Sequence, residues 1–205
     1  MSLLSIQNLS LAIHGTSILK DVSLDIAPGE VFGIIGESGS GKSMTAFSVM
    51  SLAPTGSEAT GKITLNGDDL LAKSEAAMCA VRGADIGMVF QEPMAALNPL
   101  RRVGDTVMEP MLLHDGLTRR AARARALSLF EEVGIPDPDR RLRQFPHEMS
   151  GGQRQRVLIA LALACNPMLL IADEPTTALD ANVALRITDL LQRLARERQM
   201  ALVFI

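Results

Sequence analysis

The sequence predicts an α/β fold whose core is a mainly parallel β-sheet, and three observations support this. The first third of the chain consists of β-rich runs separated by turn residues. The middle has the apolar spacing of helices. The last third alternates helical and apolar segments, which implies parallel strands joined by crossover helices. We expect residues 1–205 to form a single domain.

The expected strands of the first third begin close to the N-terminus. Leu4–Ile13 and Ile18–Ile26 are β-rich, and a turn separates them. Val31–Ile35 is apolar without alternation, which is typical of a strand buried on both faces. Lys62–Leu65 is a further expected strand, and it ends in a tight turn at Asn66-Gly67.

The later segments are expected to be helices and buried strands. One helix should begin at an N-cap, Thr118, and end at Gly134. It has a basic face, which we interpret as a solvated surface in preference to a binding patch. The arginines of this face are Arg119, Arg120, Arg123 and Arg125. The last third should then run as helix Ser150–Cys165, strand Met168–Ala172, helix Asn182–Arg198 and strand Ala201–Ile205.

The composition is typical of a cytosolic globular protein, with 47% hydrophobic and 21% charged residues. The net charge of −3 argues against nucleic acid as the main partner, because a nucleic-acid interface is usually basic. The longest apolar run, Val157–Cys165, is about half the ~20 residues of a membrane helix. Cys79 and Cys165 have no metal-ligand spacing, and we expect two buried thiols.

A glycine-rich motif after the third expected strand predicts a nucleoside triphosphate site. It matches GxxxxGK[ST] and lies between a strand and a helix, which is the context that supports this motif. Its glycines let backbone N–H groups approach phosphate oxygens, and the helix N-terminus adds partial positive charge. Lys42 should bind the β- and γ-phosphates, and Ser43 should ligate Mg²⁺. The motif consists of Gly36, Glu37, Ser38, Gly39, Ser40, Gly41, Lys42 and Ser43.

Two acids at the end of the strand Met168–Ala172 predict metal and water chemistry beside this motif. A neighbouring parallel strand would bring Asp173 to the phosphate loop, where it can hold Mg²⁺ through water. Glu174 can then point to the other side and act as general base toward the attacking water. The alternative is that both acids only cap the following helix, but the phosphate loop elsewhere in the chain favours the metal site.

A second helix start, at Ser150, also has the composition of a phosphate-binding site. Ser150 and Gln153 fit a capping box, and a well-made N-cap is the structural alternative. Gly151 and Gly152, however, each cost about 1 kcal/mol relative to alanine in a helix. Glycines at a helix start expose backbone N–H groups to a phosphate. The chain therefore has two phosphate-binding helix starts, one more than a single nucleotide needs.

These motifs together resemble those of the ATP-binding subunits of ABC transporters. In order they are the P-loop 36–43, the Q-loop residue Gln91, the signature Met149–Gln153, the acidic strand end Asp173-Glu174 and the D-loop Thr177–Asp180. Three longer strings look like the family branch that imports oligopeptides, dipeptides and nickel, and like halves of fused importers. The strings are VFQEPMAALNPL (Val89–Leu100), FPHEMSGGQRQR (Phe145–Arg156) and IADEPTTALD (Ile171–Asp180).

The resemblance implies a fold and an activity. The fold would be that of a P-loop NTPase with an N-terminal antiparallel β subdomain. A helical subdomain at about 92–165 would be inserted between the core segments 1–91 and 166–205. The activity would be hydrolysis of ATP with Mg²⁺, which would power import at the cytoplasmic face of the cell membrane.

By the same resemblance, two ATP-binding subunits would form a head-to-tail dimer. The signature of one subunit would then bind the nucleotide held by the P-loop of the other. Gln91 would contact the metal or the attacking water and act in catalysis beside Lys42 and Glu174, and Asp180 would cross the dimer interface. Residues Glu92–Leu100 and the helical segment after them would face the transmembrane permease subunits.

The chain departs from the family pattern at two places. The family usually has an aromatic residue well before the P-loop to stack on adenine, and this chain has Ile13 and His14 there. The family's switch histidine should follow Ile205, so we expect a chain cut short before it. Three interpretations stay open: an importer ATPase, an ABC-type ATPase of DNA repair or translation, and a nucleotide-binding fragment without turnover.

Overall fold

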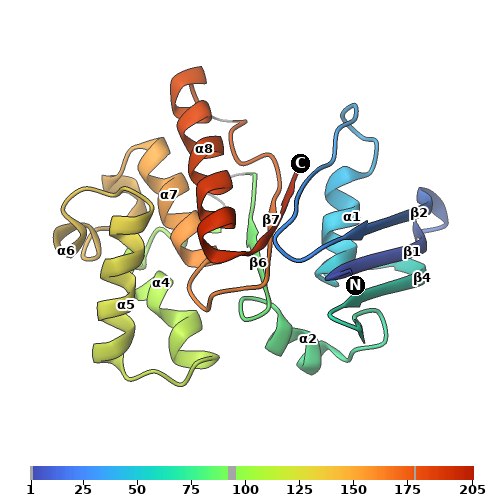
Figure 1. Cartoon of the computed structure of the whole chain (residues 1–205), viewed down its shortest axis with the longest axis horizontal. Helices are drawn as coiled ribbons and strands as arrows, with labels where there is room; N and C mark the ends of the chain where they lie inside the picture. The colour runs from blue at the N-terminus through green and yellow to red at the C-terminus, as the bar shows by residue number, and fades with distance from the viewer. Residues whose placement is uncertain (1, 92–95, 178) are drawn as a thin grey trace.

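The structure, a computed structural model, describes residues 2–91, 96–177 and 179–205. It contains an antiparallel sheet, a parallel sheet and a group of helices (Figure 1). The strands are β1 (Leu4–Ile13), β2 (Thr16–Ile26), β3 (Val31–Gly33), β4 (Ser57–Leu65), β5 (Asp68–Asp69), β6 (Ile86–Val89), β7 (Leu169–Ala172) and β8 (Ala201–Phe204). The helices are α1 (Lys42–Val49), α2 (Glu75–Val81), α4 (Val103–Leu113), α5 (Arg119–Glu132), α6 (Pro138–Arg141), the 3₁₀ helix η1 (Pro146–Glu148), α7 (Gly151–Ala162) and α8 (Ala181–Arg198).

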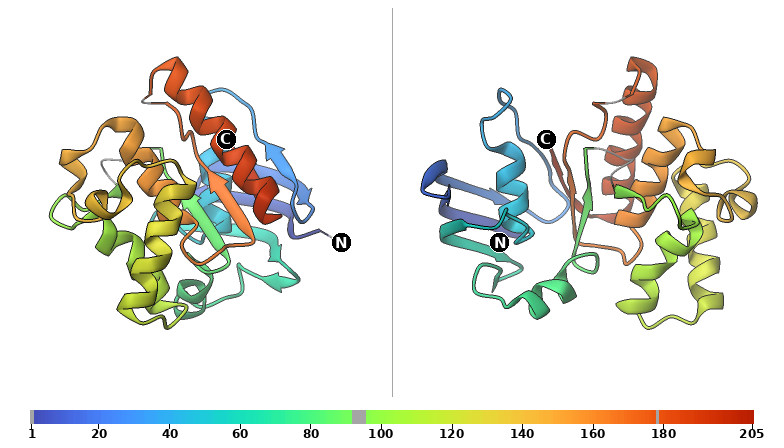
Figure 2. Two further views of the ribbon diagram at one scale, coloured as in Figure 1. Left: turned by 60° about the vertical axis from the view of Figure 1, so that its left-hand side comes forward. Right: turned by 180° about the vertical axis from the view of Figure 1, so that it is seen from behind.

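The parallel sheet has the strand order β3-β8-β7-β6, which confirms the prediction of a mainly parallel core. Strand β7 lies inside this sheet and is buried throughout. Leu169 and Ile171 pack into one core, with α1 and the antiparallel sheet. Leu170 and Ala172 point to the opposite face and pack with the helices. This strand therefore joins the two halves of the molecule, which lie on either side of the parallel sheet (Figure 2).

Strand β6 is an element that the sequence analysis did not identify. It pairs in parallel with β7, from Ile86↔Leu169 to Val89↔Ala172. Gly87 is required in it, because a Cβ atom there would lie 2.3 Å from the carbonyl oxygen at the end of α7. A short run that contains glycine gives a weak strand signal, since the close approach to a distant helix is not visible in the local pattern.

The N-terminal antiparallel sheet has the order β2-β1-β4-β5. Strand β1 pairs with β4 over its whole length, from Leu4↔Leu65 to Ile13↔Ser57. Strand β4 therefore begins well before the expected start at Lys62. Its first residues are mostly exposed, so the buried alternation that marks a strand is present only in its last part.

The expectation of a strand buried on both faces at Val31–Ile35 is wrong. Strand β3 ends at Gly33, Val31 is 44% exposed and Ile35 is 98% exposed. In the part of the chain that the structure describes, β3 pairs only with β8 and lies at the edge of the parallel sheet. Among the described residues, a strand lies on one side of β3 alone. Solvent therefore reaches its apolar side chains from the open edge of the sheet.

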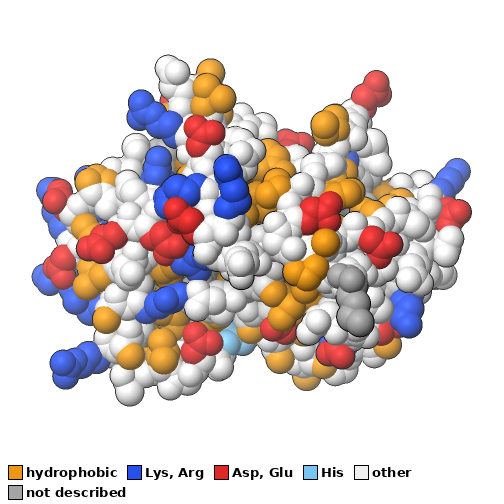
Figure 3. All heavy atoms as spheres, viewed as in Figure 1, with side chains coloured by type: hydrophobic (Ala, Val, Ile, Leu, Met, Phe, Trp, Pro, Cys, Tyr) orange, Lys and Arg blue, Asp and Glu red, His pale blue; other side chains and the backbone are white. Residues whose placement is uncertain are grey.

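The basic face predicted on α5 is a solvated surface, and two of its arginines form ion pairs. Thr118 caps α5 as expected. Arg119 donates to Asp105 at 2.7 Å, and Arg123 pairs with Asp139. Acidic side chains lie among the basic ones over this half of the molecule (Figure 3).

None of the helices that the structure describes combines the length and the apolar character that a membrane span requires.

The expectation of two buried thiols is wrong. Cys79 is exposed, because α2 buries Met78 and Val81 against the core and leaves Cys79 on its outer side. Cys165, which follows α7, is partly exposed. Both cysteines are free.

Candidate functional site

The P-loop connects β3 to α1, and its lysine folds back onto the loop. Lys42 Nζ donates to the carbonyl oxygens of Gly36 and Glu37, at 2.8 and 2.7 Å. Gly41 precedes α1 with a φ of 90°, and a Cβ atom there would lie 2.5 Å from Cδ2 of Leu19. Glycine is therefore required for the turn that presents the first N–H groups of α1. Such a loop can hold an anion at the positive end of the helix.

Strand β7 delivers Asp173 to the start of α1. Ser43 Oγ donates to Asp173 Oδ1 at 2.9 Å, although 130 residues separate the two in the chain. Asp173 is only 3% exposed. This burial raises the pKa of the Asp173 carboxyl above its ordinary value; the hydrogen bond from Ser43 opposes the rise, and the charge of Glu174 adds to it. The site therefore disfavours the negative charge of Asp173 unless a cation is present.

The Ser43 and Asp173 pair fits a magnesium ion. Hydroxyl and carboxylate oxygens are the ligands that Mg²⁺ prefers, and Mg²⁺ usually keeps several waters and binds substrate phosphates besides one or two carboxylates. Within the described residues, no group of three or more His, Cys, Asp or Glu side chains is placed to hold a metal on its own. Waters and phosphate oxygens would be the remaining ligands of a cation at this position.

Glu174 lies next to this pair and is held by two hydrogen bonds. Gln91 Nε2 donates to Glu174 Oε2 at 2.7 Å, and Thr177 Oγ1 donates to the same oxygen at 2.9 Å. The backbone N–H of Glu174 donates to the carbonyl oxygen of Ile205 at 3.1 Å. The structure thus brings together Gln91 and Glu174, the two residues that the sequence analysis expects to act on the attacking water. The sequence analysis missed the hydroxyl of Thr177, three residues after the acid, although a threonine at this spacing is a recognisable signal for a local hydrogen bond.

The second predicted group lies at the starts of α7 and α8. Ser150 and Gln153 form the capping box. The backbone N–H of Ser150 donates to Gln153 Oε1 at 3.1 Å, and the backbone N–H of Gln153 donates to Ser150 Oγ at 3.3 Å. Asp180 caps α8 by accepting from the N–H of Val183 at 3.0 Å. The capping alternative is therefore present in the geometry, and Asp180 is engaged within its own chain. The same residues also line one open pocket, together with Gly151, Gly152, Arg156, Leu179 and Arg186.

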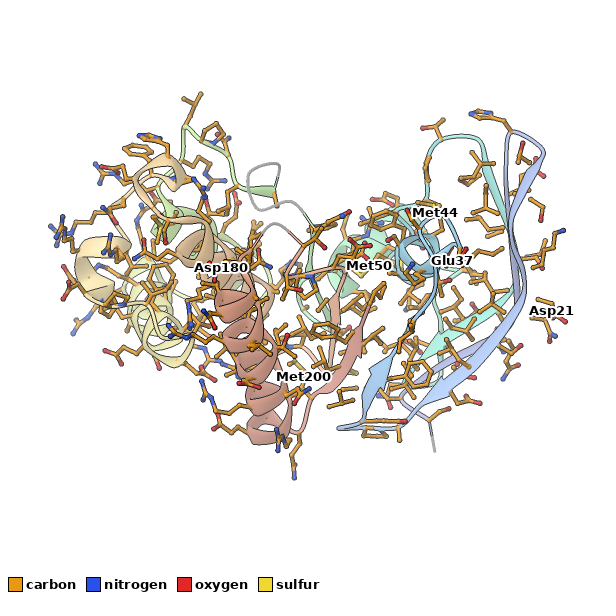
Figure 4. The ribbon with its side chains drawn as sticks, turned by 90° about the horizontal axis from the view of Figure 1, so that it is seen from above. Asp21, Glu37, Met44, Met50, Asp180 and Met200 are labelled. Atoms are coloured by element: carbon orange, nitrogen blue, oxygen red, sulfur yellow. The ribbon has the colours of Figure 1, made fainter. Side chains whose placement is uncertain are left out.

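These two groups of residues do not meet within one chain. The pocket at the start of α7 is lined by no residue of the P-loop. Asp180 lies with the helices, while Glu37 of the P-loop lies near α1, well apart from it (Figure 4). The two helix starts that the sequence predicts to bind phosphate therefore lie in separate places within one chain.

A family profile described as "ABC transporter" matches residues 19–177, a span that includes the P-loop, the signature and both strand-end acids. The chain belongs to the ABC transporter family. This membership confirms the resemblance that the motifs carried.

Several curated relatives of this ABC protein are about half identical to it. The chain is 51% identical over 209 residues to the "Peptidoglycan transport ATP-binding protein YejF" of Agrobacterium fabrum, covering 99% of this chain and 38% of the relative. It is 49% identical to the "Probable D,D-dipeptide transport ATP-binding protein DdpD" of Escherichia coli, with coverages of 98% and 63%. It is 46% identical to the "Dipeptide transport ATP-binding protein DppD" of Bacillus subtilis, with coverages of 98% and 62%. The chain thus spans less than two thirds of the length of these relatives.

Solved structures of ABC cassettes have the same fold. A post-hydrolysis dimer of the ATP-binding cassette MJ0796, bound to ADP and Pi, superposes with a TM-score of 0.85 at 31% identity, covering 98% of this chain and 86% of that one. CbiO1 from Clostridium perfringens, part of the ABC transporter complex cbiONQ, gives 0.83 at 28% identity, covering 99% and 77%. These likenesses confirm the predicted α/β fold.

Other predicted site residues lie away from the P-loop contacts or outside the described residues. His14 is an exposed turn residue between β1 and β2, and its N–H donates to the carbonyl oxygen of Gly56 at 3.1 Å. The first residues of the segment Glu92–Leu100, expected to face permease subunits, lie outside the described residues, as does Ala178 of the D-loop.

Proposed function

We propose that this ABC protein binds ATP with Mg²⁺ and hydrolyses it to power import of peptides or a related small solute. The observation that carries the proposal is the contact of Ser43 with Asp173 at the start of α1, with Lys42 and Glu174 beside it. A P-loop lysine, a hydroxyl and a strand-end carboxylate are the parts that phosphoryl transfer requires. The peptide assignment is supported by the printed names of the relatives.

Each residue has a role that follows from its position. Lys42 would exchange its two carbonyl acceptors for phosphate oxygens, since bonds between charged partners are stronger. Ser43 and Asp173 would hold Mg²⁺, whose chemistry is to neutralise charge on the β- and γ-phosphates. Gln91 would sense the metal or the water, and Glu174 would accept the proton of the attacking water.

We further propose that the complete nucleotide sites form between two ATP-binding subunits arranged head to tail. The support is the separation of the P-loop from the pocket at Ser150–Gln153 within one chain. Asp180 would contact the opposite site across this interface. The solved cassette MJ0796 is described as dimeric, which agrees with such an arrangement.

The partners and the placement in the cell follow from the same proposal. The chain would be a single nucleotide-binding domain with its helical part at about 92–165. That part, including Glu92–Leu100, would dock on permease subunits. The docked chain would then lie at the cytoplasmic face of the membrane. The relatives are named as transport ATP-binding proteins, which supports this placement. The net charge of −3 argues against nucleic acid as a partner.

Replacement of Lys42 tests the proposed function. In Lys42→Ala the β- and γ-phosphates lose their cation, so we expect ATP affinity to fall at least about tenfold and phosphate release to vanish. Calorimetry measures the affinity for ATP, and phosphate release from Mg-ATP at a series of protein concentrations measures hydrolysis. Lys62→Ala, at an exposed position of β4, is the control. ATP binding that is the same in the parent and in Lys42→Ala, or absent from a folded parent, would contradict the proposal.

A further inference from the structure

The carboxylate of Glu174 is held on one of its two oxygens. Gln91 Nε2 and Thr177 Oγ1 both donate to Oε2, at 2.7 and 2.9 Å. Within the described residues, Oε1 accepts no hydrogen bond. A carboxylate anchored in this way has a fixed orientation and keeps its second oxygen available as a proton acceptor.

The backbone brings Thr177 back to Glu174. Glu174 has a φ of 45°, in the left-handed region that residues other than glycine seldom adopt. The N–H of Thr177 donates to the carbonyl oxygen of Glu174 at 3.3 Å, so the chain turns tightly over these residues. A strained residue persists only where surrounding contacts hold it, and such residues cluster at functional sites.

We propose that Thr177 is a positioning residue for hydrolysis, because its hydroxyl anchors Glu174 Oε2 and leaves Oε1 directed at the attacking water. This inference rests on the proposed function. Glu174 Oε1 would take a proton from the water, while the water oxygen bonds to the γ-phosphorus and the bond from that phosphorus to the bridging oxygen of ADP breaks.

Thr177 has this task because Gln91 has a second one. In the proposed mechanism Gln91 turns toward the metal or the water when nucleotide is bound. It then no longer holds Glu174 Oε2. Thr177, only three residues from the acid and joined to it by a backbone hydrogen bond, is the donor that remains.

Two variants at Thr177 and one neighbouring control test the proposal. Thr177→Val removes the hydroxyl at nearly constant shape, Thr177→Ser keeps it, and Thr176→Val changes the adjacent threonine, whose hydroxyl makes no hydrogen bond within the described residues. We expect kcat to fall about 10- to 100-fold in Thr177→Val with the ATP dissociation constant changed less than about twofold. Thr177→Ser and Thr176→Val should keep the parental kcat. A parental kcat in Thr177→Val, or an equal loss in kcat and in affinity, would overturn the proposal.

A spectroscopic measurement on the nucleotide-free chain separates this inference from the proposed function. The side-chain carboxyl carbon of Glu174, assigned by its disappearance in Glu174→Gln, reports the hydrogen bond directly in a ¹³C spectrum. We expect its resonance to move in Thr177→Val and to stay in place in Thr177→Ser and Thr176→Val. An unmoved resonance in Thr177→Val overturns the contact whatever the ATPase activity is, whereas a parent without turnover bears on the proposed function alone.

Discussion

Lys42 and Asp173 carry opposite charges in one site, yet each is satisfied by a neutral partner. Lys42 donates to two backbone carbonyl oxygens, and Asp173 accepts from the hydroxyl of Ser43. Both sets of bonds are weaker than those that phosphate and a divalent cation would offer. Lys42 and Asp173 are therefore held by internal hydrogen bonds that phosphate and a cation could replace.

Asp173→Asn is expected to stabilise the chain when no Mg²⁺ is present. Folding raises the pKa of the Asp173 carboxyl. The free energy of unfolding therefore falls as the pH rises from the pKa of the unfolded state through the pKa of the folded state, and this loss of stability persists at neutral pH. Urea midpoints without Mg²⁺ should therefore be higher for Asp173→Asn than for the parent at neutral pH, and the difference should shrink as the pH is lowered through this window. A lower midpoint for Asp173→Asn at neutral pH would show that burial does not dominate the energetics of Asp173.

At the scale of elements, a largely buried ion pair links α8 to α5. Arg198 donates from Nε and Nη2 to the two carboxylate oxygens of Glu132, at 2.8 and 2.6 Å. The exposed fractions of the two side chains are 16% and 27%. Arg198 Nη1 also donates to Asn166 Oδ1 at 2.8 Å, just before β7. One arginine thus joins the end of α8, the end of α5 and the chain that enters the core sheet.

Glu132→Gln should destabilise the fold by about 1–2 kcal/mol, because a largely buried arginine loses its charged partner. Equilibrium urea unfolding measures this. Glu197→Gln is the matched control, since Glu197 pairs with Arg193 on the same helix where both side chains are about half exposed, and it should change stability by less than about 0.5 kcal/mol. Equal losses of stability in the two variants would contradict a larger contribution from the Arg198–Glu132 ion pair.

The elements that could be predicted from the sequence are those whose signals are local. Helix α8 begins after Asp180 because an N-cap precedes a strongly amphipathic run, and β7 is an unbroken apolar run. The misplaced elements depend on distant contacts. Strand β6 needs the close approach of α7 to Gly87, and the exposure of Val31 depends on which strands flank β3. Likewise, the motifs predicted that Asp173 would lie beside the P-loop, but the hydroxyl contact of Thr177 depends on the turn at Glu174.

At the scale of the whole molecule, the two helix starts that the sequence predicts to bind phosphate lie in different places. The P-loop lies with α1 and the antiparallel sheet, and the signature lies with α7 and α8 among the helices. The parallel sheet separates these two halves (Figure 2). In the proposed dimer, each chain would supply the half of the nucleotide site that the other lacks.

ATP-dependent dimerisation of Glu174→Gln shows whether two copies of this chain share their nucleotide sites. The variant lacks the proposed base, so it should bind ATP without hydrolysing it and accumulate in the closed form. Sedimentation velocity should show monomers without nucleotide and dimers with Mg-ATP, and Ser150→Arg, which places a bulky cation at the start of α7, should remain monomeric while still binding ATP. A Glu174→Gln chain that binds ATP and stays monomeric at every concentration tested would contradict a nucleotide site shared between two copies of this chain.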